Sequence, residues 1–81
     1  MLLKIYSLKK VLYEGAAKSL NVQSVDGELT ILDNHLPLVA ALKNGPIKIR
    51  GADDKEEIIP AASGFLEVKP GSEVTILANT E

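Results

Sequence analysis

Apolar and polar residues alternate with a period of two over several short stretches of the chain. The clearest is Ile47-Lys48-Ile49-Arg50, which as an extended strand points two apolar side chains to one face and two cations to the other. Residues 66–69, 74–76 and 20–23 follow the same pattern. Because side chains alternate between the two faces of a β-strand, this period predicts half-buried strands.

Turn residues interrupt these stretches about every 8 to 12 residues, the spacing typical of antiparallel sandwiches and barrels. They predict eight or nine short strands in an all-β chain with no second domain. At Lys69-Pro70-Gly71-Ser72, proline presets φ at the second position and glycine accepts the positive φ of the third, which favours a type II turn between the last two strands. The predicted turns are Glu14-Gly15, Asp26-Gly27, Asn44-Gly45-Pro46, residues 51–54 and Pro70-Gly71.

One apolar segment, residues 36–42, departs from the two-residue period. Pro37 suits the first position of a helix, and Leu38, Ala41 and Leu42 would then share one face. The segment is too short to be a stable helix unaided. A helical turn is therefore one interpretation of this segment, and the pattern leaves its assignment open.

Composition restricts the possible partners. Eighty-one residues form one domain, and 46% hydrophobic with only 4% aromatic content predicts an aliphatic core. Nine basic and 11 acidic residues give a net charge of −2, which argues against a nucleic-acid partner. No cysteine is present to form disulfides, and no apolar stretch approaches the ~18 residues that span a bilayer. We expect a soluble intracellular protein whose membrane contact runs through a partner.

Candidate catalytic and metal-binding groups do not converge in the sequence. His35 is the only histidine, and no signature connects it to a nucleophilic serine. Asp33 and His35 would supply two metal ligands, whereas a structural zinc site needs four and a catalytic one three. The glycines are scattered among the turns, so no phosphate-binding loop is predicted. We predict no catalytic residue, no bound metal and no cofactor.

The acidic stretch 53–57 leaves one alternative function open. It most simply forms a solvated hairpin tip. Lipoyl and biotinyl carrier domains are also small all-β modules, and they present a modified lysine at such a tip, where Lys55 would lie. However, Lys55 lies past the midpoint of the chain, and acids rather than small residues follow it. A carrier domain modified on Lys55 is the alternative to a structural module.

Two stretches of the chain carry a distinctive combination of motifs. Residues 26–38 (DGELTILDNHLPL), with residues 42–45 after them, are similar to D/E-G-E-x-G-I-L-P-x-H-x-P-L with a later L-K-x-G. Residues 63–68 (SGFLEV) and 74–78 (VTILA) are similar to G-G-F-L-E-V and V-T-I-L-A-D. In this order and spacing the motifs resemble the epsilon subunit of rotary ATP synthases, called delta in mitochondria, over essentially the whole chain. Thr30, Asp33 and Ser63 depart from the pattern, which has glycine, proline and glycine there.

The resemblance implies a flattened sandwich of two antiparallel sheets with about ten short strands, formed by residues 1–81. It implies a non-catalytic central-stalk subunit, monomeric when isolated, that joins the gamma subunit to the c-ring and couples proton translocation to ATP synthesis. Such a subunit lies on the cytoplasmic face of the bacterial plasma membrane, or the equivalent face of a mitochondrial or thylakoid membrane, and touches the membrane only through the c-ring.

The resemblance also assigns two interfaces by family position. A carboxylate facing the c-ring would accept hydrogen bonds from polar or cationic loop groups. An apolar segment without charges suits the core of an interface with gamma, although Leu38 and Leu42 would equally serve the sandwich core. The implied c-ring residues are Glu28, Asp33, Asn34 and His35, and the implied gamma residues are Leu36, Pro37, Leu38 and Val39.

Epsilon subunits normally continue after the last strand into an α-helical hairpin that inhibits ATP hydrolysis. This sequence stops at Asn79-Thr80-Glu81, so the hairpin is expected to be absent. We accordingly expect the 81-residue protein to support coupling without the inhibition that the hairpin gives.

Overall fold

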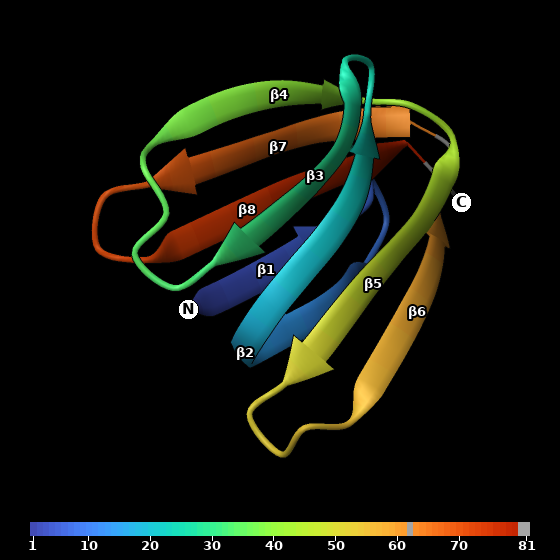
Figure 1. The fold of residues 1–81 in the computed structure, drawn as a ribbon. Coiled ribbons are helices and arrows are strands. Elements are labelled where there is room, and N and C mark those ends of the chain that lie inside the picture. The colour runs from blue at the N-terminus through green and yellow to red at the C-terminus, as the bar shows by residue number, and fades with distance from the viewer. Residues whose placement is uncertain (62, 80–81) are drawn as a thin grey trace.

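The computed structural model describes residues 1–61 and 63–79, and in them the chain forms eight β-strands and no helix (Figure 1). The all-β class is therefore confirmed. Eight strands agree with the eight or nine that the turn spacing predicts and are somewhat fewer than the ten or so that the resemblance implies. Within the same residues no helix is long and apolar enough to cross a membrane. The strands are β1 (Leu2–Tyr6), β2 (Val11–Ser24), β3 (Gly27–Leu32), β4 (Leu38–Leu42), β5 (Gly45–Gly51), β6 (Glu56–Ala61), β7 (Ser63–Lys69) and β8 (Glu73–Asn79).

Two layers share the long strand β2. The first half of β2 pairs with β1, which continues the layer β1-β8-β7-β4, and its second half lies between β3 and β5 in the layer β3-β2-β5-β6. A single pairing of Ser24 with Leu42 joins β2 to β4 and connects the layers again at the other side. The result is a flattened sandwich, as the family resemblance implies. The pairing of β1 with β8 is parallel, so one layer is mixed rather than purely antiparallel.

The turn predicted at Glu14-Gly15 is wrong, because both residues lie inside β2. Glu14 pairs with Lys4 and Gly15 with Leu3. Beyond them the register of β2 against β5 shifts between Ala17 and Ser19, and Figure 1 shows β2 turning a corner between the layers. A glycine beside such an irregularity allows a strand to bend without reversing its direction.

Residues 36–42, for which the sequence left a helical turn open, contain a strand instead. Leu38 to Leu42 form β4, whose register against β7 runs from Leu38 opposite Val68 to Leu42 opposite Gly64. An isolated helical turn leaves most of its backbone groups without partners, whereas β7 supplies a full ladder. The strand is therefore favoured by a neighbour that is distant in the sequence.

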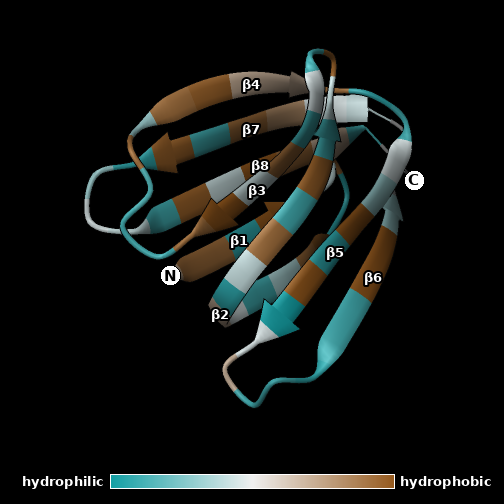
Figure 2. Cartoon of the chain, in the orientation of Figure 1, coloured by the Kyte–Doolittle hydropathy of each residue, from teal (hydrophilic) through white to brown (hydrophobic). Residues whose placement is uncertain are grey.

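The core is aliphatic, as the composition predicts, and it lies between the two layers. Its residues come from the inward positions of the alternating strands, such as Ile47 and Ile49 on β5, which are 2% and 1% exposed. Figure 2 shows the alternation of hydrophobic and hydrophilic bands along β5. The buried apolar residues are Leu3, Ile5, Ala17, Leu20, Val22, Ile31, Leu42, Ile47, Ile49, Leu66, Val68, Val74, Ile76 and Ala78.

Two predicted hairpins are present. Gly71 has the positive φ, 84°, that the predicted turn requires, and the turn joins β7 to β8. Residues 52–55 form the tip between β5 and β6. The Asp54 carboxylate accepts a hydrogen bond of 2.9 Å from Lys18 Nζ, and this bond with its charge attraction lowers the pKa of Asp54. The acidic stretch is thus a hairpin tip, as predicted, although its last two glutamates belong to β6.

Candidate partner-binding surface

Exposed apolar side chains lie next to one another on the outer face of the layer β1-β8-β7-β4. Phe65 on β7 stands opposite Leu77 on β8, and Leu77 stands opposite Tyr6 on β1. Phe65 is 61% exposed, and these side chains line two adjoining hollows of about 330 and 340 Å³. We call this surface the apolar strip; it consists of Tyr6, Leu8, Val39, Ala41, Phe65 and Leu77.

The local sequence explains why these side chains face outward. In Phe65-Leu66 and Ile76-Leu77 two apolar residues stand in succession, so a strand can bury only one of each pair. Leu66 and Ile76 are fully buried, which turns Phe65 and Leu77 to the outside. Neither residue is predicted from the sequence pattern to belong to a binding site. The break in the alternation was the available signal, because an outward apolar residue on a half-buried strand is unexpected.

The four residues implied to contact gamma lie in different environments. Leu36 and Pro37 are exposed in the loop before β4, and Val39 belongs to the apolar strip. Leu38 is half-buried and packs against the core, because it points to the opposite face of β4. Leu42 is buried in the core itself. The apolar strip therefore contains one of the four residues.

The residues implied to contact the c-ring fall in two places. Asp33, Asn34 and His35 lie in the loop between β3 and β4, whereas Glu28 is exposed near the start of β3, opposite Gln23. Asp33 follows Glu28 by five residues along β3 and its end, a separation of about 17 Å at ~3.3 Å per residue. These residues therefore do not form one cluster.

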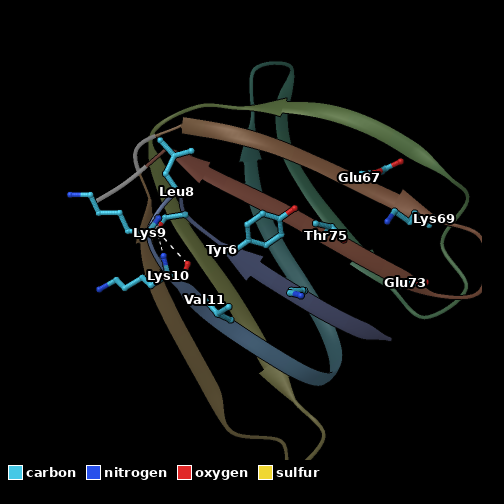
Figure 3. A pocket seen from close by; sticks show the side chains of 11 residues that line it. Tyr6, Leu8, Lys9, Lys10, Val11, Glu67, Lys69, Glu73 and Thr75 are labelled. Atoms are coloured by element: carbon cyan, nitrogen blue, oxygen red, sulfur yellow. Dashed lines mark hydrogen bonds between the residues drawn. The ribbon is translucent and has the colours of Figure 1, made fainter.

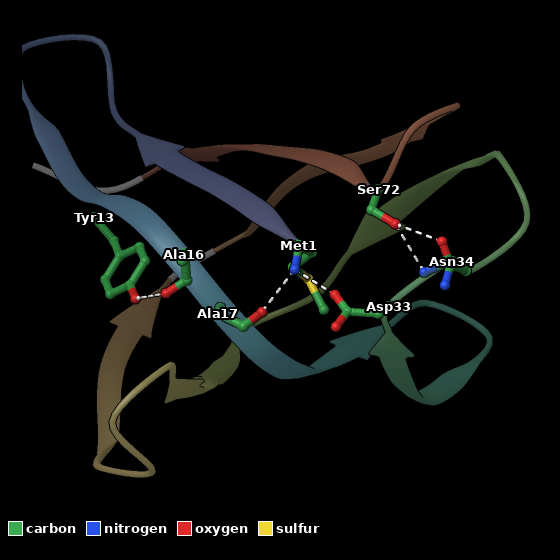
Figure 4. Close-up of polar contacts among 7 residues, drawn as sticks. All are labelled: Met1, Tyr13, Ala16, Ala17, Asp33, Asn34 and Ser72. Carbon is green, nitrogen blue, oxygen red and sulfur yellow. Dashed lines mark hydrogen bonds and ion pairs between the residues drawn. The ribbon is translucent and has the colours of Figure 1, made fainter.

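The loop between β3 and β4 is tied down by polar contacts (Figure 4). The Met1 amino group donates to the Ala17 carbonyl oxygen at 2.9 Å and forms an ion pair with the Asp33 carboxylate. The Asn34 backbone N–H donates to Ser72 Oγ at 2.9 Å, and that hydroxyl donates to Asn34 Oδ1 at 3.2 Å. The loop is thus fixed to the chain start and to the turn between β7 and β8.

His35 is half-buried next to this cluster. Its Nδ1 lies 2.7 Å from the Leu36 carbonyl oxygen, and its backbone N–H donates to the Leu32 carbonyl oxygen at 3.2 Å. Within the described residues no three histidine, cysteine, aspartate or glutamate side chains gather as a metal site would require. The apolar strip, an exposed group of neighbouring apolar side chains with two aromatic rings, has the composition of a binding surface.

The fold and this surface define a small β-sandwich interaction domain. The family model described as "ATP synthase, Delta/Epsilon chain, beta-sandwich domain" matches residues 1–81. The chain therefore belongs to the delta/epsilon chain family of ATP synthases. This membership confirms the family resemblance read from the motifs.

Individual relatives agree with the assignment. The chain is 39% identical over 80 residues to the ATP synthase epsilon chain of Brevibacillus brevis, covering 99% of this chain and 60% of that relative. A chain of the Euglena gracilis mitochondrial ATP synthase (OSCP/F1/c-ring) superposes with a TM-score of 0.92 at 17% identity, over 99% of this chain and 51% of that one. A Tetrahymena thermophila mitochondrial ATP synthase chain (central stalk/c-ring) gives 0.84 at 16% identity, over 99% and 63%. At these identities the two structures establish the fold.

Proposed function

We propose that this chain is a non-catalytic central-stalk component of a rotary ATP synthase, in which it joins the gamma subunit to the c-ring and couples proton translocation to ATP synthesis. The observation that carries the proposal is the family match over residues 1–81, since it places the whole sandwich in the delta/epsilon chain family. The names of the structural relatives, which include a c-ring and a central stalk, support it. The family assignment argues against a carrier domain, although Lys55 does lie at the tip between β5 and β6.

The apolar strip is the proposed gamma interface. Of the implied residues Leu36, Pro37, Leu38 and Val39, only Val39 belongs to it, while Leu38 packs against the core on the opposite face of β4. The most exposed aromatic side chain of the strip is that of Phe65 on β7. Contiguous exposed apolar side chains on a small soluble domain mark a protein contact, because burying them against a partner removes apolar area from water.

The proposed c-ring contact is the tethered loop with Asp33, Asn34 and His35, and Glu28 makes a separate contact at the other end of β3. The loop is held by Met1 and Ser72, so little conformational entropy remains to be lost when a partner binds it. In this arrangement the chain contacts the membrane only through the c-ring. It lies on the cytoplasmic face of the bacterial plasma membrane, or on the equivalent face of a mitochondrial or thylakoid membrane.

The gamma interface is tested by measuring complex formation with the cognate gamma subunit at micromolar concentration. We expect a stable one-to-one complex, and we expect Phe65→Asp to weaken it about 10- to 100-fold, because a carboxylate in an apolar interface core loses its hydration. Ile58→Asp is the matched control: Ile58 is 53% exposed on β6, outside the apolar strip, and its replacement should leave the affinity unchanged. Absence of binding by the unchanged chain, or equal losses in the two variants that circular dichroism shows to be folded, contradicts the proposal.

A further inference from the structure

A groove with a volume of about 570 Å³ crosses the outer face of β1 and β8 beside the apolar strip (Figure 3). Four lysines and two glutamates line it, a net charge of +2, whereas the whole chain carries −2 and the rest of it therefore −4. Positive charge is concentrated in this place on an acidic protein. We call it the basic groove; its lysines are Lys4, Lys9, Lys10 and Lys69.

The two ends of the basic groove differ in charge. Figure 3 shows Lys69 with Glu67 and Glu73 at one end, and Lys9 and Lys10 together at the other. No carboxylate of residues 1–61 and 63–79 lies within ion-pair distance of either Lys9 or Lys10. The end formed by the turn between β1 and β2 is therefore purely cationic within the described chain.

This turn is held in one conformation by a buried serine. Ser7 is 5% exposed, and its Oγ accepts hydrogen bonds from the backbone N–H groups of Lys9 at 3.4 Å and Lys10 at 3.3 Å. The Ser7 N–H also donates to the Lys10 carbonyl oxygen at 2.9 Å. The turn presents Leu8, which is 91% exposed and lines both the basic groove and the apolar strip. A partner that covers the apolar strip therefore meets Lys9 and Lys10 at its edge.

On the basis of the proposed function, we propose that the gamma segment covering the apolar strip carries carboxylates that pair with Lys9 and Lys10. Opposite charges at the edge of an apolar contact fix its orientation and accelerate association. An anionic membrane surface suits the groove less well, because Glu67 and Glu73 at its other end would be repelled. The continuity of Leu8 with the apolar strip favours a polypeptide.

The experiment measures gamma affinity for the unchanged chain, for K9E/K10E and for the neutral K9Q/K10Q. The control K48E/K55E makes the same change in net charge at exposed lysines on β5 and at the tip between β5 and β6. We expect charge reversal to weaken binding about 10- to 100-fold, neutralisation to weaken it less, and the control to change it less than about threefold. Affinity of the unchanged chain should also fall when NaCl rises from about 0.05 to 0.3 M, and that of K9Q/K10Q should fall less, because salt screens charge pairs.

Two outcomes overturn this inference while leaving the proposed function intact. One is gamma binding that K9E/K10E weakens no more than K48E/K55E does. The other is binding of the chain to vesicles of equal parts phosphatidylglycerol and phosphatidylcholine that requires Lys9 and Lys10, while gamma binding does not. If the unchanged chain binds no gamma at all, the proposed function itself fails, and the inference fails with it.

Discussion

At the scale of single residues, Gly64 is the position where the backbone leaves no room for a side chain. A Cβ there would collide with the Leu77 carbonyl oxygen and lie 3.1 Å from the Ala78 Cα on β8. Ser63 stands where the family motif has the other glycine of a pair, and its half-buried side chain accepts a hydrogen bond of 3.3 Å from the Asn79 amide. The departure at Ser63 is therefore tolerated, and the retained glycine is the one that close packing of β7 on β8 requires.

Gly64→Ala is expected to lower the free energy of unfolding by about 1–3 kcal/mol, because the added methyl group must push β8 away from β7. Ser63→Ala, the neighbouring control, should change it by less than ~0.5–1 kcal/mol, since only an exposed hydrogen bond is lost. Urea unfolding followed by circular dichroism measures both. Equal stability of the two variants would show that the contact between the strands is looser than described.

At the scale of elements, the alternating pattern identified strands wherever one face is buried by the chain's own core. The predicted stretches 20–23, 47–50, 66–69 and 74–76 lie within β2, β5, β7 and β8. The corner in β2 and the strand β4 were missed for a common reason. Both depend on pairing partners distant in the sequence, β5 for the corner and β7 for β4, and local periodicity carries no information about those partners.

The pairing scheme predicts which strands are most protected. β1 lies between β2 and β8, whereas in the described part of the chain β6 pairs with β5 alone. Native-state amide exchange measured by NMR should therefore be slowest in β1 and β8 and faster in β6, because edge strands open locally at a lower cost. Amide exchange in β6 that is as slow as in β1, or slower, would contradict this pairing scheme.

At the scale of the whole molecule, sequence and structure each contribute a different part of the proposed site. Family position pointed to Val39 and to the loop with Asp33, Asn34 and His35. It did not show that Glu28 lies at the far end of β3 from this loop. Residues that are close in the sequence are far apart in space when an extended strand lies between them. The apolar strip exists only through the register of four strands, which brings Tyr6, Val39, Phe65 and Leu77 to one face, and no short stretch of sequence contains it.

The proposed coupling of proton translocation to ATP synthesis is tested most directly by measuring proton pumping. The 81-residue protein is added to a rotary ATP synthase depleted of its epsilon subunit and reconstituted in vesicles, and ATP-driven acidification is measured together with the rate of hydrolysis. We expect pumping to recover, because residues 1–81 match the β-sandwich domain of the family. Vesicles that hydrolyse ATP but fail to recover pumping would contradict this coupling role.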